Sequence, residues 1–119
     1  MPILPKVKLE AVQKARLEAQ ARVIKALAHP TRLLLVQELA KGERCVCDLT
    51  HLAGADISTV SKHLSLLRSA GVLVSEKRGT QVFYRLNMPC VLKILDCIDP
   101  ILRKSAQDHL AFLSDRSVQ

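Results

Sequence analysis

The segment from residue 47 to residue 70 constrains the fold most, because it contains two short helical patterns separated by a glycine. The first pattern stops at Gly54, and Asp56 stands where the N-cap of the second pattern, residues 57–70, is expected. At about 3.6 residues per turn, the second pattern has an apolar stripe and an opposite face of small hydroxyls and one lysine. The stripe comprises Ile57, Val60, Leu64 and Leu67, and the opposite face comprises Ser58, Lys62, Ser65 and Ser69. No acidic residue occurs from 57 to 74, so this face is typical of a surface that meets an anion.

Two further helices are predicted before this segment. Over residues 8–28, apolar side chains recur at steps of three and four, which is typical of an amphipathic helix. Pro30 is well suited to the first position of a second helix. Residues 31–40 then carry apolar side chains around most of the helix, and Gly42 ends it. We therefore expect this second helix to form the buried centre of the domain.

A β-hairpin and a last helix are predicted after residue 70. Two β-rich runs, residues 72–77 and 81–86, flank a basic turn that contains Gly79. Residues 89–113 are helical in pattern, and Asp99-Pro100 is expected to break or kink that helix, with Asp99 capping its second piece. The predicted fold is a single domain over residues 1–119, mainly α with a small β-hairpin, in the order α-α-α-α-β-β-α.

Composition narrows the range of partners. The chain has 119 residues, of which 49% are hydrophobic, and this excludes intrinsic disorder. Its 18 Lys and Arg residues exceed its 11 Asp and Glu residues by seven, which favours nucleic acid as a partner, with an anionic membrane surface second. No apolar run approaches the roughly 20 residues of a membrane span, and residues 1–6 lack the features of a secretory signal. We expect a soluble, cytoplasmic protein that does not bind membranes.

Two short helices followed by a basic hairpin describe a winged helix-turn-helix, a fold that binds double-stranded DNA. Its second helix enters the major groove with its N-terminal residues towards the base edges, and its hairpin, or wing, reaches phosphates or the minor groove. A hydroxyl-rich helix face or a charged hairpin tip alone is more often solvated surface, but both occur here in the right order. The predicted DNA-binding residues are Ser58, Thr59, Ser61, Lys62 and His63 on the helix, and Lys77, Arg78 and Gln81 at the hairpin.

Four motifs resemble those of the ArsR/SmtB family of transcriptional repressors, and the arsenic-sensing branch above all. They are His29-Pro30-Thr31-Arg32-Leu33, Cys45-Val46-Cys47-Asp48-Leu49, the run from Val60 to Leu73, and Arg78-Gly79-Thr80 with Val82-Phe83-Tyr84-Arg85-Leu86. The resemblance implies a homodimer on a palindromic operator that an inducer releases. It implies dimerisation through residues 8–28 and 89–113, a helix-turn-helix over 47–70 and a wing over 73–86. Ile57 departs from the many relatives that carry a polar residue there.

Cys45 and Cys47 are the candidate ligands for a metal or metalloid ion. Thiolates bind soft ions, namely As(III), Sb(III), Cd(II), Pb(II), Zn(II) and Cu(I). On an ideal helix, residues two apart point about 200° away from each other, so one ion could bridge both sulfurs only by distorting the helix. Thiolate ligation can be worth ~10 kcal/mol, against ~1 kcal/mol for an end-turn interaction, so the ion is expected to prevail. The alternative is that both cysteines are small buried apolar residues.

The third ligand is open. The arsenic-sensing archetype has a third cysteine where this chain has Thr50, and no cysteine precedes Cys45. In our alignment, the zinc-site positions of the last helix are occupied by Met88, Cys90, Ile101 and Lys104, so that site is not expected. Cys90 is the first candidate, from the same or the partner subunit, and His51 and Cys97 follow. Ordinary packing or surface roles are the default for all three.

The first hypothesis is a metalloid sensor with As(III) as its first inducer, and it has three alternatives. A redox or reactive-sulfur sensor of the same fold would link one of the Cys45/Cys47 thiols to Cys90 or Cys97. A DNA-binding protein that responds to no ligand is a further alternative. An enzyme is not expected, because the sequence has no nucleophile–base pair, paired carboxylates or phosphate-binding loop at usable spacing.

Overall fold

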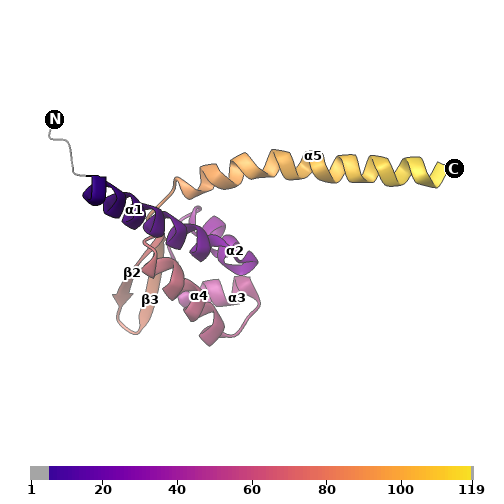
Figure 1. Cartoon of the computed structure of the whole chain (residues 1–119). Coiled ribbons are helices and arrows are strands. Elements are labelled where there is room, and N and C mark those ends of the chain that lie inside the picture. The colour runs from indigo at the N-terminus through magenta and orange to yellow at the C-terminus, as the bar shows by residue number, and fades with distance from the viewer. Residues whose placement is uncertain (1–5, 119) are drawn as a thin grey trace. The chain divides into compact units, whose positions relative to one another are not determined.

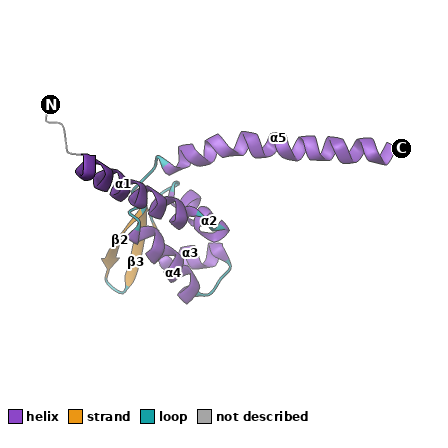
Figure 2. Ribbon diagram, in the orientation of Figure 1, coloured by secondary structure: helices purple, strands orange, loops and turns teal. Residues whose placement is uncertain are grey.

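The computed structural model describes the backbone of residues 6–118 and the side-chain burial of residues 8–110. Its elements are α1 (Lys6–Leu27), α2 (Pro30–Leu39), β1 (Arg44–Cys45), α3 (Val46–Ala53), α4 (Ile57–Ser69), β2 (Leu73–Arg78), β3 (Gln81–Leu86) and α5 (Val91–Val118) (Figures 1 and 2). The predicted fold class and element order are confirmed, with β1 as an unpredicted addition. Residues 1–5, most of the segment used to argue against a secretory signal, lie outside the described part.

The chain divides into two compact units, Met1–Met88 and Pro89–Gln119, which we describe separately. The first contains α1 to α4 and the three strands, and the second contains α5. The boundary falls where the last helical pattern of the sequence begins.

The core of the first unit is built from α2, α3, α4 and the sheet, and α2 is part of it, as the sequence predicts. On α2, Leu35 and Val36 are fully buried. On α4, Val60, Leu64 and Leu67 are fully buried along one stripe, because a spacing of three and four residues returns to the same helix face. Ile57 continues this stripe by its spacing but is not part of the core. Ile57 is the first residue of α4, and its side chain is 56% exposed beyond the edge of the core.

The turn between α3 and α4 is set by two local features that the sequence predicts. Gly54 closes α3 with φ +65°, a left-handed conformation that glycine adopts without steric cost. Asp56 then caps α4, and its carboxylate accepts a hydrogen bond from the backbone N–H of Thr59 at 3.4 Å. These two residues give the helix-turn-helix its short connection.

The strands form one antiparallel sheet in the order β1-β3-β2. β2 and β3 pair from Leu73↔Leu86 to Arg78↔Gln81, which leaves Gly79 and Thr80 as the two-residue turn. β1 joins the other edge of β3 through the pair Cys45↔Phe83 and the pair beside it. The cysteine motif is therefore attached to the wing, and a two-residue strand has too little periodicity to be found by sequence pattern.

In the second unit, α5 continues through Pro100, so the predicted break is wrong. Proline lacks one backbone N–H, which removes one hydrogen bond of the helix, and the helical residues on both sides outweigh that loss. Asp99 is therefore an interior residue of α5 and caps no second piece.

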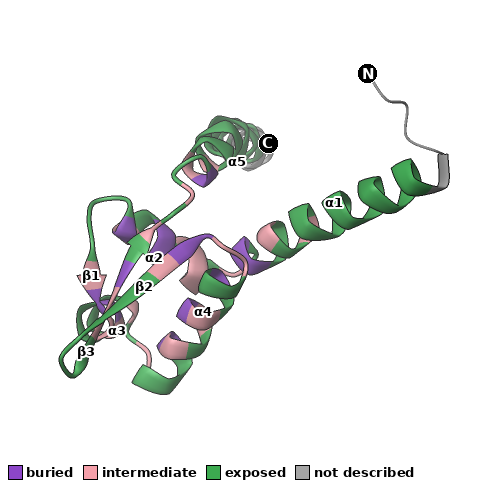
Figure 3. Ribbon diagram, turned by 90° about the vertical axis from the view of Figure 1, so that its left-hand side faces the viewer, coloured by how far each residue is buried: buried purple, intermediate pink, exposed green. Residues whose placement is uncertain are grey.

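Both helices that were predicted to dimerise carry exposed apolar side chains. Figure 3 shows that α1 is exposed along most of its length. The large exposed apolar residues are Leu9, Val12, Leu17 and Ile24 on α1, and Ile94, Ile98, Ile101, Leu102 and Leu110 on α5. Within residues 6–118, no helix combines the length and the apolar character that crossing a bilayer requires.

We expect Leu64→Ala to lower the free energy of unfolding by about 2–5 kcal/mol, because the substitution leaves a cavity in the α2–α4 core. Leu66→Ala is the matched control on the same helix, since Leu66 is 51% exposed and should cost much less. Urea unfolding at one fixed protein concentration measures both. Equal losses for the two variants would contradict this account of the core.

Candidate DNA-binding surface and thiol pocket

The first turn of α4 is organised around the carboxylate of Asp56. The Ser58 hydroxyl donates to Oδ2 of Asp56, and the Thr59 hydroxyl donates to Oδ1 at 2.6 Å. These hydrogen bonds, that of Ser58 first, lower the pKa of Asp56 to about 2. Because both hydroxyl protons are used, the free lone pairs of these side chains remain as hydrogen-bond acceptors.

The remaining predicted residues of α4 differ in exposure. Lys62 is exposed, like Ser58 and Thr59, and these three lie on the surface that sequence analysis predicts to face DNA. Ser61 is half-buried. His63 is also half-buried, and its contacts are with α2.

His63 holds α4 to the start of α2. Its Nδ1 lies 3.2 Å from Nη1 of Arg32, and its ring centroid lies 4.5 Å from that of His29. His29 caps α2, because its Nδ1 accepts a hydrogen bond from the backbone N–H of Thr31 at 3.1 Å. Burial lowers the pKa of His63, and the nearby His29 and Arg32 lower it further. Its predicted DNA contact stays a prediction, beside this packing role.

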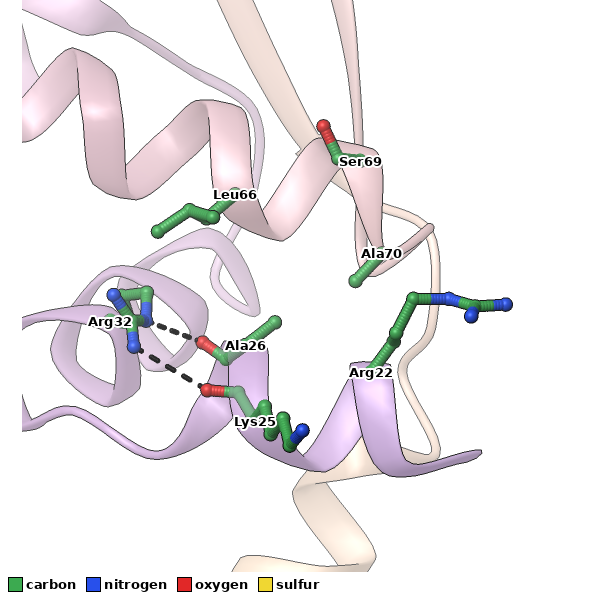
Figure 4. A pocket seen from close by; sticks show the side chains of 7 residues that line it. All are labelled: Arg22, Lys25, Ala26, Arg32, Leu66, Ser69 and Ala70. Atoms are coloured by element: carbon green, nitrogen blue, oxygen red, sulfur yellow. Dashed lines mark hydrogen bonds between the residues drawn. The ribbon is translucent and has the colours of Figure 1, made fainter. Parts of the chain in front are cut away.

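Arg32, which contacts His63, also contacts α1. Its Nε donates to the carbonyl oxygen of Ala26 at 2.6 Å and its Nη2 to that of Lys25 at 3.4 Å, as the dashed lines in Figure 4 show. These carbonyls belong to the last turn of α1, whose end groups have no partner within the helix. Arg32 lines a pocket of about 260 Å³ together with residues of α1 and α4, namely Arg22, Lys25, Ala26, Leu66, Ser69 and Ala70.

The wing exposes Lys77, Arg78 and Gln81 near its tip. Of these, Arg78 is held by two carboxylates. Nη1 and Nη2 of Arg78 donate to the two oxygens of Glu43 at 2.6 and 3.0 Å, and Nη2 also donates to Glu76 at 2.8 Å. These bonds, that of Glu76 first, raise the pKa of Arg78, and Arg78 in turn lowers the pKa of Glu76.

Cys45 and Cys47 border one pocket of about 240 Å³. Cys45 is 9% exposed and Cys47 is exposed. The ideal-helix argument for their opposite directions is wrong for Cys45, because this residue precedes α3 with an extended backbone at φ −80° and ψ 159°. The pocket is also lined by Val46, by Ile57 and Ser61 of α4, and by Thr80, Gln81 and Val82 of the wing. The thiols thus share a pocket with both elements that the sequence predicts to contact DNA.

Within the first unit, the candidate ligand His51 is not part of this pocket's lining. His51 is exposed on α3. Cys90 and Cys97 belong to the second unit, and both are free and exposed. Thr50, which replaces the archetype's third cysteine, donates its hydroxyl proton to the carbonyl oxygen of Val46 at 2.7 Å. Among the residues with described side chains, no three His, Cys, Asp or Glu groups are placed to hold a metal ion together.

Comparison with known proteins identifies the family. A family model described as "Bacterial regulatory protein, arsR family" matches residues 29–75. The solution structure of a homodimeric winged helix-turn-helix DNA-binding domain from Mycobacterium bovis, a possible ArsR-family regulator, is 30% identical with a TM-score of 0.69. The match covers 87% of this chain and 92% of that one. The chain belongs to the ArsR family. This is a family of transcriptional regulators, so the chain is not an enzyme.

Two curated relatives match over part of their length. The transcriptional repressor SmtB of Mycobacterium tuberculosis is 39% identical over 70 residues, which is 59% of this chain and 52% of SmtB. The arsenic resistance regulator ArsR1 of Pseudomonas putida is 42% identical over 66 residues, which is 55% of this chain and 52% of ArsR1. The match thus spans about half the length of each relative.

The packing of His63 against Arg32 and His29 predicts that acid lowers the free energy of unfolding. The folded state holds the pKa of His63 below 6.5, so the unfolded state binds the proton more readily. The stabilisation is complete above about pH 6.5 and is lost as the pH falls through the folded-state pKa. We expect the urea midpoint of the wild type to fall more between about pH 7.5 and 5.5 than that of His63→Gln, which keeps an acceptor for Arg32 but does not titrate. Parallel pH profiles of the two proteins would contradict this.

Proposed function

We propose that this ArsR-family protein is a homodimeric repressor that binds operator DNA and releases it when a thiophilic ion, As(III) first, binds at Cys45 and Cys47. The observation that carries the proposal is the shared pocket, in which both thiols adjoin α4 and the wing tip. An ion that binds there acts directly on the two elements that contact DNA in a winged helix-turn-helix.

Charge and exposure support the DNA-binding part. The chain carries a net charge of +7, and phosphate contacts dominate the affinity of proteins for DNA. Ser58, Thr59 and Lys62 are exposed on α4, as are Lys77 and Gln81 on the wing. As a DNA-bound regulator, the protein would work in the cytoplasm.

Exposed apolar side chains support the homodimer. Residues such as Leu9 and Val12 on α1, and Ile94 and Ile101 on α5, are about half exposed or more. Apolar residues at helical spacing on a surface are typical of an interface. The M. bovis structure is described as homodimeric. In this proposal, α1 and α5 of two copies pack together and set the spacing of two recognition helices on DNA.

The donor set supports a soft ion. Two sulfurs in one pocket suit As(III), Sb(III), Cd(II), Pb(II) or Zn(II), and thiolate is the ligand that selects such ions. The described side chains around the pocket supply no third sulfur. We assign the third position to Cys90, of the same or the partner subunit, ahead of His51 and Cys97.

Release follows from the connection of Cys45 to its neighbours. Cys45 pairs with Phe83 of β3 and occupies the N-cap position of the eight-residue helix α3, where its side chain makes no capping hydrogen bond. Ligation of two thiolates can be worth ~10 kcal/mol, whereas each end-turn interaction is worth ~1 kcal/mol, so β1 and the start of α3 yield to the ion. Movement there shifts the pocket wall that α4 and the wing share, and the operator-binding geometry is lost.

The decisive measurement is DNA affinity with and without the ion. A duplex selected by the protein from a random pool serves as the operator, and fluorescence anisotropy reports binding. We expect As(III) to weaken binding roughly tenfold to a hundredfold, the usual range of allosteric coupling, with Sb(III), Cd(II) and Zn(II) titrated in parallel. Arsenic-edge X-ray absorption counts the bound sulfurs.

Serine variants supply the controls. Cys45→Ser with Cys47→Ser should abolish the response and keep DNA binding, whereas Cys97→Ser should respond almost normally. Cys90→Ser distinguishes a two-sulfur from a three-sulfur site. The proposal is refuted when none of the four ions releases DNA, or when the Cys45/Cys47 double variant responds like the wild type.

A redox or reactive-sulfur sensor is the second candidate, because Cys47, Cys90 and Cys97 are exposed free thiols. Peroxide would oxidise two thiols to one disulfide, and its two oxygen atoms would leave as water. This candidate predicts a disulfide between the Cys45/Cys47 motif and Cys90 or Cys97, together with lower DNA affinity. Non-reducing mass spectrometry detects the bond, and its absence after peroxide or polysulfide treatment counts against the candidate.

A further inference from the structure

We propose that Glu43 lowers the affinity of the wing for DNA, because its carboxylate competes with DNA phosphate for the guanidinium of Arg78. The inference goes beyond the proposed function, because it concerns DNA affinity when the thiols are free. It is independent of what the thiols bind.

The geometry of the pair is that of a phosphate site. Glu43 accepts two parallel hydrogen bonds from Arg78, at 2.6 and 3.0 Å. Arginine binds carboxylate and phosphate with the same two-pronged geometry, so Glu43 occupies the donors that a phosphate would use. Glu43 precedes β1 and Arg78 ends β2, so the contact joins two segments 35 residues apart in sequence.

The carboxylates at this point of the wing cancel the positive charge that would attract DNA. Arg78 and the nearby Arg85 are positive, and Glu43 and Glu76 are negative, so the four charges balance. A phosphate that approaches this cluster meets no free cation at Arg78, although the sequence predicts one there. With Glu43 removed, Arg78 and Glu76 would balance each other, and one face of the guanidinium would become available.

The ion pair between Arg78 and Glu43 is exposed enough for a phosphate to replace the carboxylate. The side chains of Arg78 and Glu43 are 46% and 29% exposed, and an ion pair that is exposed to this extent supplies only a small part of the stability of a domain, even with two hydrogen bonds. Phe83 lies under the guanidinium, with Cζ of Arg78 4.6 Å from the ring centroid, and this contact does not require Glu43. The wing itself is paired from Leu73↔Leu86 to Arg78↔Gln81. Removal of the Glu43 charge should therefore leave the fold intact.

The test is the salt dependence of DNA binding by Glu43→Gln, with no ion added. Each additional phosphate contact steepens the plot of log affinity against log salt by about 0.9. We expect Glu43→Gln to bind the selected duplex more tightly than the wild type, with a slope steeper by about that amount. Its advantage should therefore shrink roughly threefold between about 50 and 200 mM salt.

Glu38→Gln is the matched control, because Glu38 forms the ion pair with Lys41 at 3.0 Å and its substitution removes the same charge. It should raise affinity less and leave the slope unchanged. Arg78→Gln should weaken binding, and adding Glu43→Gln to it should then do no more than Glu38→Gln does. The guanidinium NMR signals of Arg78 should shift more on addition of the duplex in Glu43→Gln than in the wild type.

The inference is overturned when Glu43→Gln keeps the wild-type slope, when it gains no more affinity than Glu38→Gln, or when its Arg78 signals shift no more than those of the wild type. None of these outcomes bears on ion-induced release, which is measured separately. Failure of this inference and failure of the proposed function are therefore distinguishable.

Discussion

The fold depends on burial of the apolar stripe of α4 against α2. Val60, Leu64 and Leu67 are fully buried, and with Leu35 and Val36 they fix which face of α4 points outwards. The hydroxyls and the lysine of the opposite face reach solvent only because this stripe is buried. His63 adds a polar contact between α4 and the start of α2, through Arg32 and His29. A recognition surface in this fold is therefore a consequence of packing on the other side of one helix.

β1 gives the cysteine motif its position. Two residues of strand are a weak element, yet the pair Cys45↔Phe83 places the motif against β3, and Cys45 also stands at the N-cap position of α3. A disturbance at Cys45 therefore reaches a sheet edge and a helix start together. Such a short strand is a suitable place for a ligand to act, because little of the core depends on it and much of the DNA-reading surface adjoins it.

Much of this could be predicted from sequence. Periodicity located the helices, Gly54 and Asp56 located the turn, and the Cys45/Cys47 motif was identified by its spacing. The failures have physical reasons. Ile57 fits the stripe, but its place at the helix end leaves it exposed, and Pro100 removes one hydrogen bond without ending α5. The shared pocket and the Glu43–Arg78 pair join residues far apart in sequence, and local patterns do not report such contacts.

The net charge of the chain favours DNA binding, whereas the carboxylates beside the predicted contact points oppose it. The excess of seven positive charges favours a polyanionic partner, yet carboxylates lie at both predicted contact points, Asp56 at the start of α4 and Glu43 at the wing. Asp56 is ionised at neutral pH, as an ordinary aspartate is, and its hydrogen bonds lower its pKa further, to about 2; Glu43 occupies the guanidinium of Arg78. A repressor that must leave its operator benefits from moderate affinity, since a smaller change in free energy then suffices for release. Under our proposal, the carboxylate of Glu43 supplies that moderation by occupying the guanidinium of Arg78.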